Sequence, residues 1–235
     1  MNKVRTDLKQ IEFKSSISTY KDDNLLILKA FLAFTVLFSI IFMSQAFASS
    51  AEPKRIVALG DSLTSGYGLE SGDSFPSQLE ILLKNDGLNV SIDNAGVSGD
   101  TTAGGLSRVE WAIEGDVKPS LVIIALGGND MLRGLPVEQT KSNLSSIIEI
   151  LQKKNIPILL VGMKSPLNLP TPFIKKFDSI YEDLAEQYDV ELYPFFLEGI
   201  AMKSELNQAD GIHPNTEGIK LIAKNMFPQV KKMIK

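Results

Sequence analysis

Residues 121–126 have the sequence LVIIAL, and Gly127-Gly128-Asn129-Asp130 follows them directly. A short run without a polar face is typical of a strand that is covered on both sides in a parallel sheet. Other short apolar segments occur at residues 56–59, 90–92, 158–161 and 190–193. Longer amphipathic stretches separate these segments, and such an alternation is the signature of consecutive βαβ units. The sequence therefore predicts an α/β fold.

The amphipathic stretches predict the helices that cover this sheet. Apolar residues recur at helical spacing within residues 75–84, 106–113, 144–151 and 173–184, and a last helix is expected from Asn215 or Thr216. Five strands with intervening helices predict a three-layer αβα sandwich with a five-stranded parallel sheet in the flavodoxin-like order 2-1-3-4-5. Because ligands bind beyond the carboxyl ends of such strands, the loops that follow the strands are expected to supply the chemistry.

The composition excludes several classes of site. The chain has 235 residues, a formal net charge of −4, one histidine and no cysteine. Nucleic-acid binding is not expected, because no basic stripe is available to neutralise phosphates. A sequence without cysteine has no disulfides, thiolate nucleophiles or cysteine zinc sites, and one histidine excludes most histidine-rich metal sites. Carboxylate and carbonyl oxygens remain as metal ligands, but no EF-hand pattern is present. We expect no metal, no cofactor and no stable protein partner.

The amino terminus has the layout of a targeting segment. Lys29 precedes an apolar run at residues 30–43, and Ala46-Phe47-Ala48 follows it. This arrangement predicts a signal peptide at residues 1–48 with cleavage near Ala48, which would leave residues 49–235 as a periplasmic or secreted domain. The alternative is an uncleaved anchor that is extended by Leu25–Leu28, with the domain outside the inner membrane.

Ser62 lies in Gly60-Asp61-Ser62-Leu63, directly after the first predicted strand. A serine in a strand-to-helix turn can expose its hydroxyl, and the amides of the following helix can face a developing negative charge. Taken alone, Ser62 is also typical of an ordinary helix N-cap. The segment does not have the spacing of a dinucleotide loop or of a P-loop.

His213 is the only histidine, and it lies in Asp210-Gly211-Ile212-His213-Pro214, a polar turn before the last predicted helix. Asp210 is three residues before it, so its carboxylate can accept a hydrogen bond from one ring nitrogen while the other nitrogen faces a serine. A single histidine is by itself more often a surface or structural residue. The joint occurrence with Ser62 at the carboxyl ends of predicted strands favours nucleophilic catalysis.

Two further loops follow predicted strands at the same edge of the sheet. Asn129 comes directly after the central strand, where its side-chain amide would suit an oxyanion hole. Residues 94–101 follow the second strand, and their glycines would allow a backbone N–H to approach the same point. Each segment alone is only a turn.

These segments resemble the four blocks of the SGNH, or GDSL, hydrolases. The matching residues are Gly60-Asp61-Ser62-Leu63, Gly99, Gly128-Asn129-Asp130, and Asp210 with His213. Longer stretches are similar to the subgroup of bacterial multifunctional thioesterase I, or lysophospholipase L1, and related arylesterases; they are Ser98–Thr101, Leu126–Asp130, Leu132–Gly134, Pro194–Phe196 and Asp210–Asn215. The resemblance covers nearly all of residues 49–235, which are identified as an SGNH hydrolase domain.

The resemblance implies a serine esterase or thioesterase that forms an acyl-enzyme. It implies Ser62 as nucleophile, His213 as base, Asp210 as the residue that orients the base, and an oxyanion hole built from the Ser62 and Gly99 amides and the Asn129 side chain. The implied substrate is a small-molecule acyl ester or thioester of the lysophospholipid, acyl-CoA or aryl ester type. The alternatives are a carbohydrate O-acetylesterase, an acyltransferase on the same scaffold, and a non-catalytic exported binding protein.

The segment 164–173, which follows the fourth predicted strand, combines apolar side chains with prolines. Leu167, Leu169 and Pro170 are expected to bind substrate as one wall of a groove for fatty acyl chains, with transient contact with membrane lipid. A plain connecting loop is the alternative.

Overall fold

The computed structural model describes residues 32, 34, 35 and 52–235. Residues Glu52–Lys235 form one compact unit. Apart from residues 32, 34 and 35, the predicted signal peptide and its cleavage point at Ala48 lie outside the described residues. None of the helices in the described part of the chain is long and apolar enough to cross a membrane.

The centre of the compact unit is a sheet of five parallel strands in the order β2-β1-β3-β4-β5. Its strands are β1 (Lys54–Gly60), β2 (Val90–Gly96), β3 (Leu121–Ala125), β4 (Ile158–Val161) and β5 (Glu191–Tyr193). Every residue of β3 is buried, as expected for an apolar strand between two paired neighbours. The predicted α/β class and strand order are confirmed.

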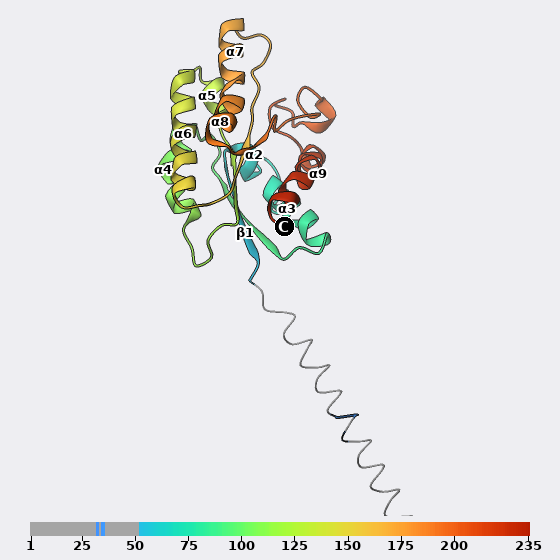
Figure 1. Cartoon of the computed structure of the whole chain (residues 1–235). Helices are drawn as coiled ribbons and strands as arrows, with labels where there is room; N and C mark the ends of the chain where they lie inside the picture. Colours follow the sequence, from blue (N-terminus) through green and yellow to red (C-terminus); the bar gives the residue numbers. More distant parts are fainter. Residues whose placement is uncertain (1–31, 33, 36–51) are drawn as a thin grey trace, which may run out of the picture. The chain divides into compact units, whose positions relative to one another are not determined.

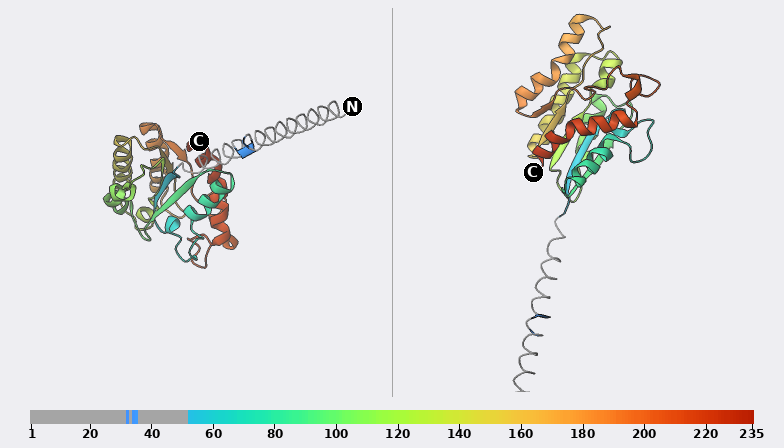
Figure 2. Two further views of the ribbon diagram at one scale, coloured as in Figure 1. Left: turned by 90° about the horizontal axis from the view of Figure 1, so that it is seen from below. Right: turned by 90° about the vertical axis from the view of Figure 1, so that its right-hand side faces the viewer.

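Helices cover both faces of this sheet (Figure 1). On one face α3 (Phe75–Asn85) packs along α9 (Thr216–Met233), and two further views show the pair side by side (Figure 2). The other face carries α4 (Thr102–Ile113), α6 (Val137–Lys153) and α8 (Ile180–Tyr188). The arrangement is the predicted three-layer sandwich.

Several element boundaries differ from the prediction. The helix expected at residues 173–184 is two helices, α7 (Thr171–Asp178) and α8, which are separated by Ser179. Ser179 keeps right-handed helical angles, φ −77° and ψ −14°. The apolar spacing therefore continues across the break, which is why periodicity alone predicted one helix.

Two short helices lie where turns were expected. Ser62 begins α2 (Ser62–Ser65), and Asn129 lies in α5 (Gly128–Leu132). Each is a single helical turn, too short to produce an amphipathic pattern in the sequence. A 3₁₀ turn, η1 (Ser204–Leu206), precedes the segment that contains His213.

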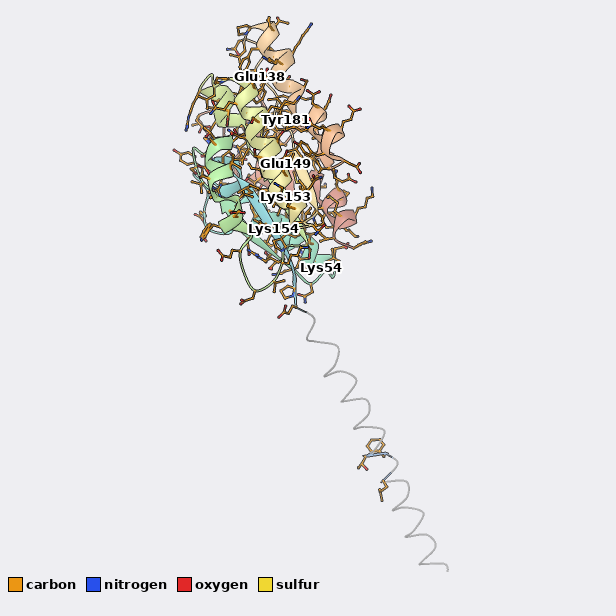
Figure 3. The ribbon with its side chains drawn as sticks, turned by 60° about the vertical axis from the view of Figure 1, so that its left-hand side comes forward. Lys54, Glu138, Glu149, Lys153, Lys154 and Tyr181 are labelled. Atoms are coloured by element: carbon orange, nitrogen blue, oxygen red, sulfur yellow. The ribbon has the colours of Figure 1, made fainter. Side chains whose placement is uncertain are left out.

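A buried hydrogen bond holds the chain at the carboxyl end of the sheet. Lys54, labelled in Figure 3, marks the amino end of β1. At the carboxyl end, the buried hydroxyl of Tyr181 on α8 donates a 2.9 Å hydrogen bond to the carbonyl oxygen of Leu126, directly after β3 (Figure 3). This contact fixes the point at which the chain leaves the central strand toward Asn129.

Candidate active site

Ser62 is positioned by the tight passage from β1 into α2. The carboxylate of Asp61 caps α2 by accepting a 3.0 Å hydrogen bond from the Leu63 amide. A Cβ atom on Gly60 would lie 2.0 Å from the Thr64 hydroxyl oxygen, so the turn excludes a side chain at this position. Ser62 is thus the first helical residue above the end of β1.

Ser62, His213 and Asp210 form a continuous chain of hydrogen bonds. His213 Nε2 lies 2.9 Å from Ser62 Oγ, and His213 Nδ1 lies 2.6 Å from Asp210 Oδ2. The other carboxylate oxygen of Asp210 accepts from the amides of Ile212, at 2.9 Å, and His213, at 3.0 Å. Hydrogen bonds from the backbone and ring of His213 lower the pKa of Asp210 to about 2, so this carboxylate is ionised at neutral pH.

The imidazole is also held by packing and by the neighbouring loop. The rings of Tyr67 and His213 have centroids 4.7 Å apart. Gln208 donates from Nε2 to the carbonyl oxygens of Tyr67, at 2.8 Å, and Pro214, at 3.0 Å, and its backbone amide donates to the His213 carbonyl oxygen at 2.7 Å. Sequence reasoning missed both Tyr67 and Gln208, because neither belongs to a catalytic pattern and their contact crosses 141 residues.

Two backbone amides at the site are free to bind a ligand. None of the hydrogen bonds between described residues uses the N–H of Ser62 or that of Gly99. Gly99 has a φ of +83°, a conformation that favours glycine, and Arg133 on the end of α5 donates a 2.7 Å hydrogen bond to its carbonyl oxygen. These amides could stabilise an oxyanion next to Ser62 Oγ.

Asn129 lies beside them and is already hydrogen-bonded within the protein. Its Nδ2 donates to the carbonyl oxygen of Asp100 at 2.9 Å and to Asp61 Oδ2 at 3.2 Å. The bond to Asp61 is the longer of the two, so a ligand oxygen would compete more easily for that hydrogen than for the one bound to Asp100. The neighbouring Asp130 is buried and accepts from the Thr102 amide at 2.8 Å, which ties α5 to the start of α4.

Asp61 is the most perturbed carboxyl at the site. Burial raises its pKa to about 6, although hydrogen bonds from the Leu63 amide and Asn129 and the charge of His213 oppose this shift. Its capping role could have been predicted, since aspartate directly before a helix is a common N-cap. Its contact with Asn129 could not be foreseen from sequence spacing.

The predicted substrate-binding residues lie in the loop between β4 and α7. This loop follows a strand at the same edge of the sheet as Ser62. Leu167 is 90% exposed, Leu169 is half-buried and Pro170 is exposed. No hydrogen bond or ring contact between described residues joins these three to Ser62, Asp210 or His213. Their role remains a prediction.

A separate hollow of about 650 Å³ lies at the opposite end of the sheet. It is lined by the end of α4, including Trp111, by the segment before β3, including Lys118, and by Lys154 after α6. None of the predicted site residues contributes to it. The chemistry-bearing side chains are therefore assigned to the carboxyl end of the sheet.

Comparison with known proteins agrees with the fold and the motifs. The GDSL-like Lipase/Acylhydrolase family matches residues 58–221, which include every residue of the hydrogen-bonded site. An arylesterase of Vibrio mimicus is 37% identical over 193 residues, covering 82% of this chain and 96% of that protein. Thioesterase 1/protease 1/lysophospholipase L1 of Escherichia coli K12 is 34% identical over 185 residues, covering 79% of this chain and 87% of that protein.

The fold is also similar to that of a solved esterase structure. The crystal structure of AlinE4, an SGNH-hydrolase family esterase, has a TM-score of 0.67 and 47% sequence identity to this chain. The match covers 80% of this chain and all of the AlinE4 chain.

Proposed function

The chain belongs to the GDSL-like lipase/acylhydrolase family and is a hydrolase of ester bonds, and from that premise we propose that it cleaves acyl esters or thioesters with Ser62 as nucleophile. The observation that carries the proposal is the unbroken hydrogen-bonded chain from Ser62 Oγ through the His213 ring to Asp210. The same arrangement activates serine in hydrolases of unrelated folds.

In the first half of the reaction, Ser62 Oγ attacks the acyl carbonyl carbon while its proton passes to His213 Nε2. The ionised Asp210 keeps the other ring proton on Nδ1 and stabilises the imidazolium. The imidazolium then protonates the leaving alcohol or thiol. An acyl-enzyme on Ser62 results.

In the second half, a water molecule takes the place of the leaving group. His213 Nε2 accepts a proton from this water as its oxygen attacks the acyl-enzyme, and then returns the proton to Ser62 Oγ. The free acid leaves and the starting state is restored. All proton transfers use one ring nitrogen.

The negative charge that develops on the carbonyl oxygen in both halves needs preorganised donors. We assign this task to the amides of Ser62 and Gly99 and to the Asn129 side chain. The unused state of both amides supports the assignment. Asn129 would contribute by sharing the hydrogen that now faces Asp61.

For the substrate, we propose acyl esters or thioesters of the lysophospholipid, acyl-CoA or aryl ester type, with a preference for lipid-like acyl groups. The names of the two relatives above and the exposed apolar side chain of Leu167 support this choice. A carbohydrate O-acetylesterase is the competing assignment on the same scaffold. We further propose that residues 1–48 direct export, so that the domain acts in the periplasm or outside the cell.

The test is kcat/KM for the purified full-length protein on p-nitrophenyl esters of increasing acyl length, with Ser62→Ala as control. We expect the rate constant to peak at medium or long chains, because apolar surface near the site rewards each buried methylene. Ser62→Ala should abolish turnover. An acetyl-only preference would favour carbohydrate deacetylation, and full activity of Ser62→Ala would refute the nucleophile.

A further inference from the structure

Arg108 on α4 binds the chain at three points around the proposed oxyanion hole. Its Nη2 donates to the carbonyl oxygen of Gly60 at 2.8 Å, and its Nη1 donates to that of Ala95 at 2.7 Å. Its Nε donates to Asp100 Oδ2 at 2.7 Å. The side chain is only 16% exposed, so these bonds are largely shielded from water.

Two of the three acceptors of Arg108 lie close in sequence to a proposed oxyanion donor. Gly60 ends β1, two residues before Ser62, and Asp100 directly follows Gly99. The carbonyl oxygen of Asp100 in turn accepts from Asn129 Nδ2. One guanidinium group therefore connects, directly or through Asp100, the three segments that carry the Ser62 amide, the Gly99 amide and the Asn129 side chain.

The chemistry of the guanidinium group suits this position. It is planar and permanently charged, and it presents several donors in a fixed arrangement, whereas a lysine ammonium is a single flexible point charge. A carbonyl oxygen can accept two hydrogen bonds, and that of Gly60 already accepts one from the Val97 amide at 3.1 Å. Arg108 is a further donor to the carbonyl oxygens of Gly60 and Ala95, and it thereby links the ends of β1 and β2.

We propose that Arg108 is a positioning residue that holds the Ser62 and Gly99 amides and the Asn129 side chain at the spacing required for one oxyanion site. The proposal rests on the proposed function of these three groups. Arg108 does not touch the substrate. It acts because a displacement of even about 1 Å at the donors costs about a hundredfold in rate.

The chain offers a matched control in Arg55. Its Nε pairs with Asp93 at 2.6 Å, its two other nitrogens donate to four carbonyl oxygens, and its side chain is 14% exposed. It belongs to β1, but it lies near the amino end of the sheet, remote from Ser62. Arg55 and Arg108 thus share their bonding and burial and differ in their distance from the site.

The experiment compares wild-type full-length protein with Arg108→Lys and Arg55→Lys on the best p-nitrophenyl ester. We expect Arg108→Lys to lower kcat by about tenfold to a hundredfold with KM changed less than about twofold, because the loss concerns the transition state. Arg55→Lys should keep kcat within about twofold of the wild-type value, even if its melting temperature falls as far as that of Arg108→Lys. Equal kcat values for the two variants would overturn the proposal.

A double-mutant cycle with Asn129→Ala separates positioning from a general loss of structure. If Arg108 acts through the oxyanion donors, Arg108→Lys should cost less in the Asn129→Ala background than in the wild type. Strictly multiplicative losses would contradict the proposal. Should Arg108→Lys fail to fold, Asp100→Ala removes the same ion pair and is expected to reduce kcat likewise; full activity of that variant would refute the proposal.

The two proposals fail in different ways. Wild-type activity in Ser62→Ala or in Asn129→Ala would refute the proposed machinery and with it the role of Arg108. An inactive Ser62→Ala and an impaired Asn129→Ala, together with an Arg108→Lys that behaves as Arg55→Lys does, would refute the role of Arg108 alone.

Discussion

At the residue scale, Asp61 combines a structural and an electrostatic task in one buried carboxyl group. One of its oxygens caps α2 through the Leu63 amide, and the other accepts from Asn129. Burial makes the charged form costly, which is why its pKa rises from 3.8 to about 6. An ionised Asp61 at neutral pH therefore lowers the stability of the folded chain relative to the protonated form.

This shift predicts how stability depends on pH. Between pH 3.8 and about 6 the folded chain binds more protons at Asp61 than the unfolded chain does, so the free energy of unfolding falls as pH rises through this window. Asp210, with its pKa lowered to about 2, acts in the opposite sense and only at lower pH. The pH range in which Asp61 affects stability therefore lies above the range in which Asp210 does.

Between about pH 4 and about pH 7, we expect the free energy of unfolding to fall by up to about 3 kcal/mol more in the wild-type protein than in Asp61→Asn. Asparagine retains an oxygen that can accept from the Leu63 amide, so the cap is kept. Urea denaturation at several pH values measures the difference. Identical pH dependence in the two proteins would mean that Asp61 does not titrate in this window.

Individual site residues differed in how far the sequence could predict them. Ser62, Asp210 and His213 were predicted because a lone histidine and the GDSL-type blocks direct attention to them, and the structure brings them within hydrogen-bonding distance. Their catalytic roles remain predictions. Arg108 was not predicted, because its acceptor Gly60 lies 48 residues away and every residue has a carbonyl oxygen, so no residue type indicates such a contact.

At the scale of elements, the strands and longer helices were predictable and the single-turn helices were not. Residues 121–126 form a continuous apolar run, and the apolar residues of α6 recur at helical spacing. By contrast, α2 and α5 are short helices set by tight turns at the ends of β1 and β3. The proposed catalytic groups depend most on such turns, since Ser62 and Asn129 both lie in them.

The loop between β4 and α7 carries the prediction that belongs to this scale. Replacing Leu167 and Leu169 together by alanine should shift the preferred acyl length and reduce kcat/KM for long esters by about tenfold, because each lost methylene contact costs about 0.8 kcal/mol. The control is Trp111→Ala, which removes an apolar side chain that is 73% exposed at the far end of α4. An unchanged profile in the double variant would make this segment a plain connection.

At the scale of the whole molecule, the two ends of the sheet have separate tasks. The carboxyl end carries Ser62, Asn129 and the loop with His213, while Arg55 binds several carbonyl oxygens near the amino end. The general fold class was predictable because an all-apolar central strand and alternating elements admit few topologies. The convergence of distant loops follows from that topology.

The position of the proposed machinery within the compact unit predicts that residues 49–235 suffice for activity. Every residue of the proposed machinery lies between Gly60 and His213, within the compact unit. We expect protein recovered from the periplasm or the medium to begin near Ser49 and to match the full-length chain in kcat/KM on the same ester. Mass spectrometry and kinetics test this together. A membrane-bound chain that still carries residues 1–48 would favour the uncleaved anchor.

The placement of the single histidine between Ser62 and Asp210 also gives the protein a built-in spectroscopic reporter. In proton NMR, one imidazole produces one set of ring signals, and a ring N–H held 2.6 Å from a carboxylate resonates far downfield of the amide region. No resonance assignment or isotope labelling is needed to identify it. Binding of an inhibitor, or a distant substitution, can therefore be followed through a single peak that originates in the proposed catalytic centre.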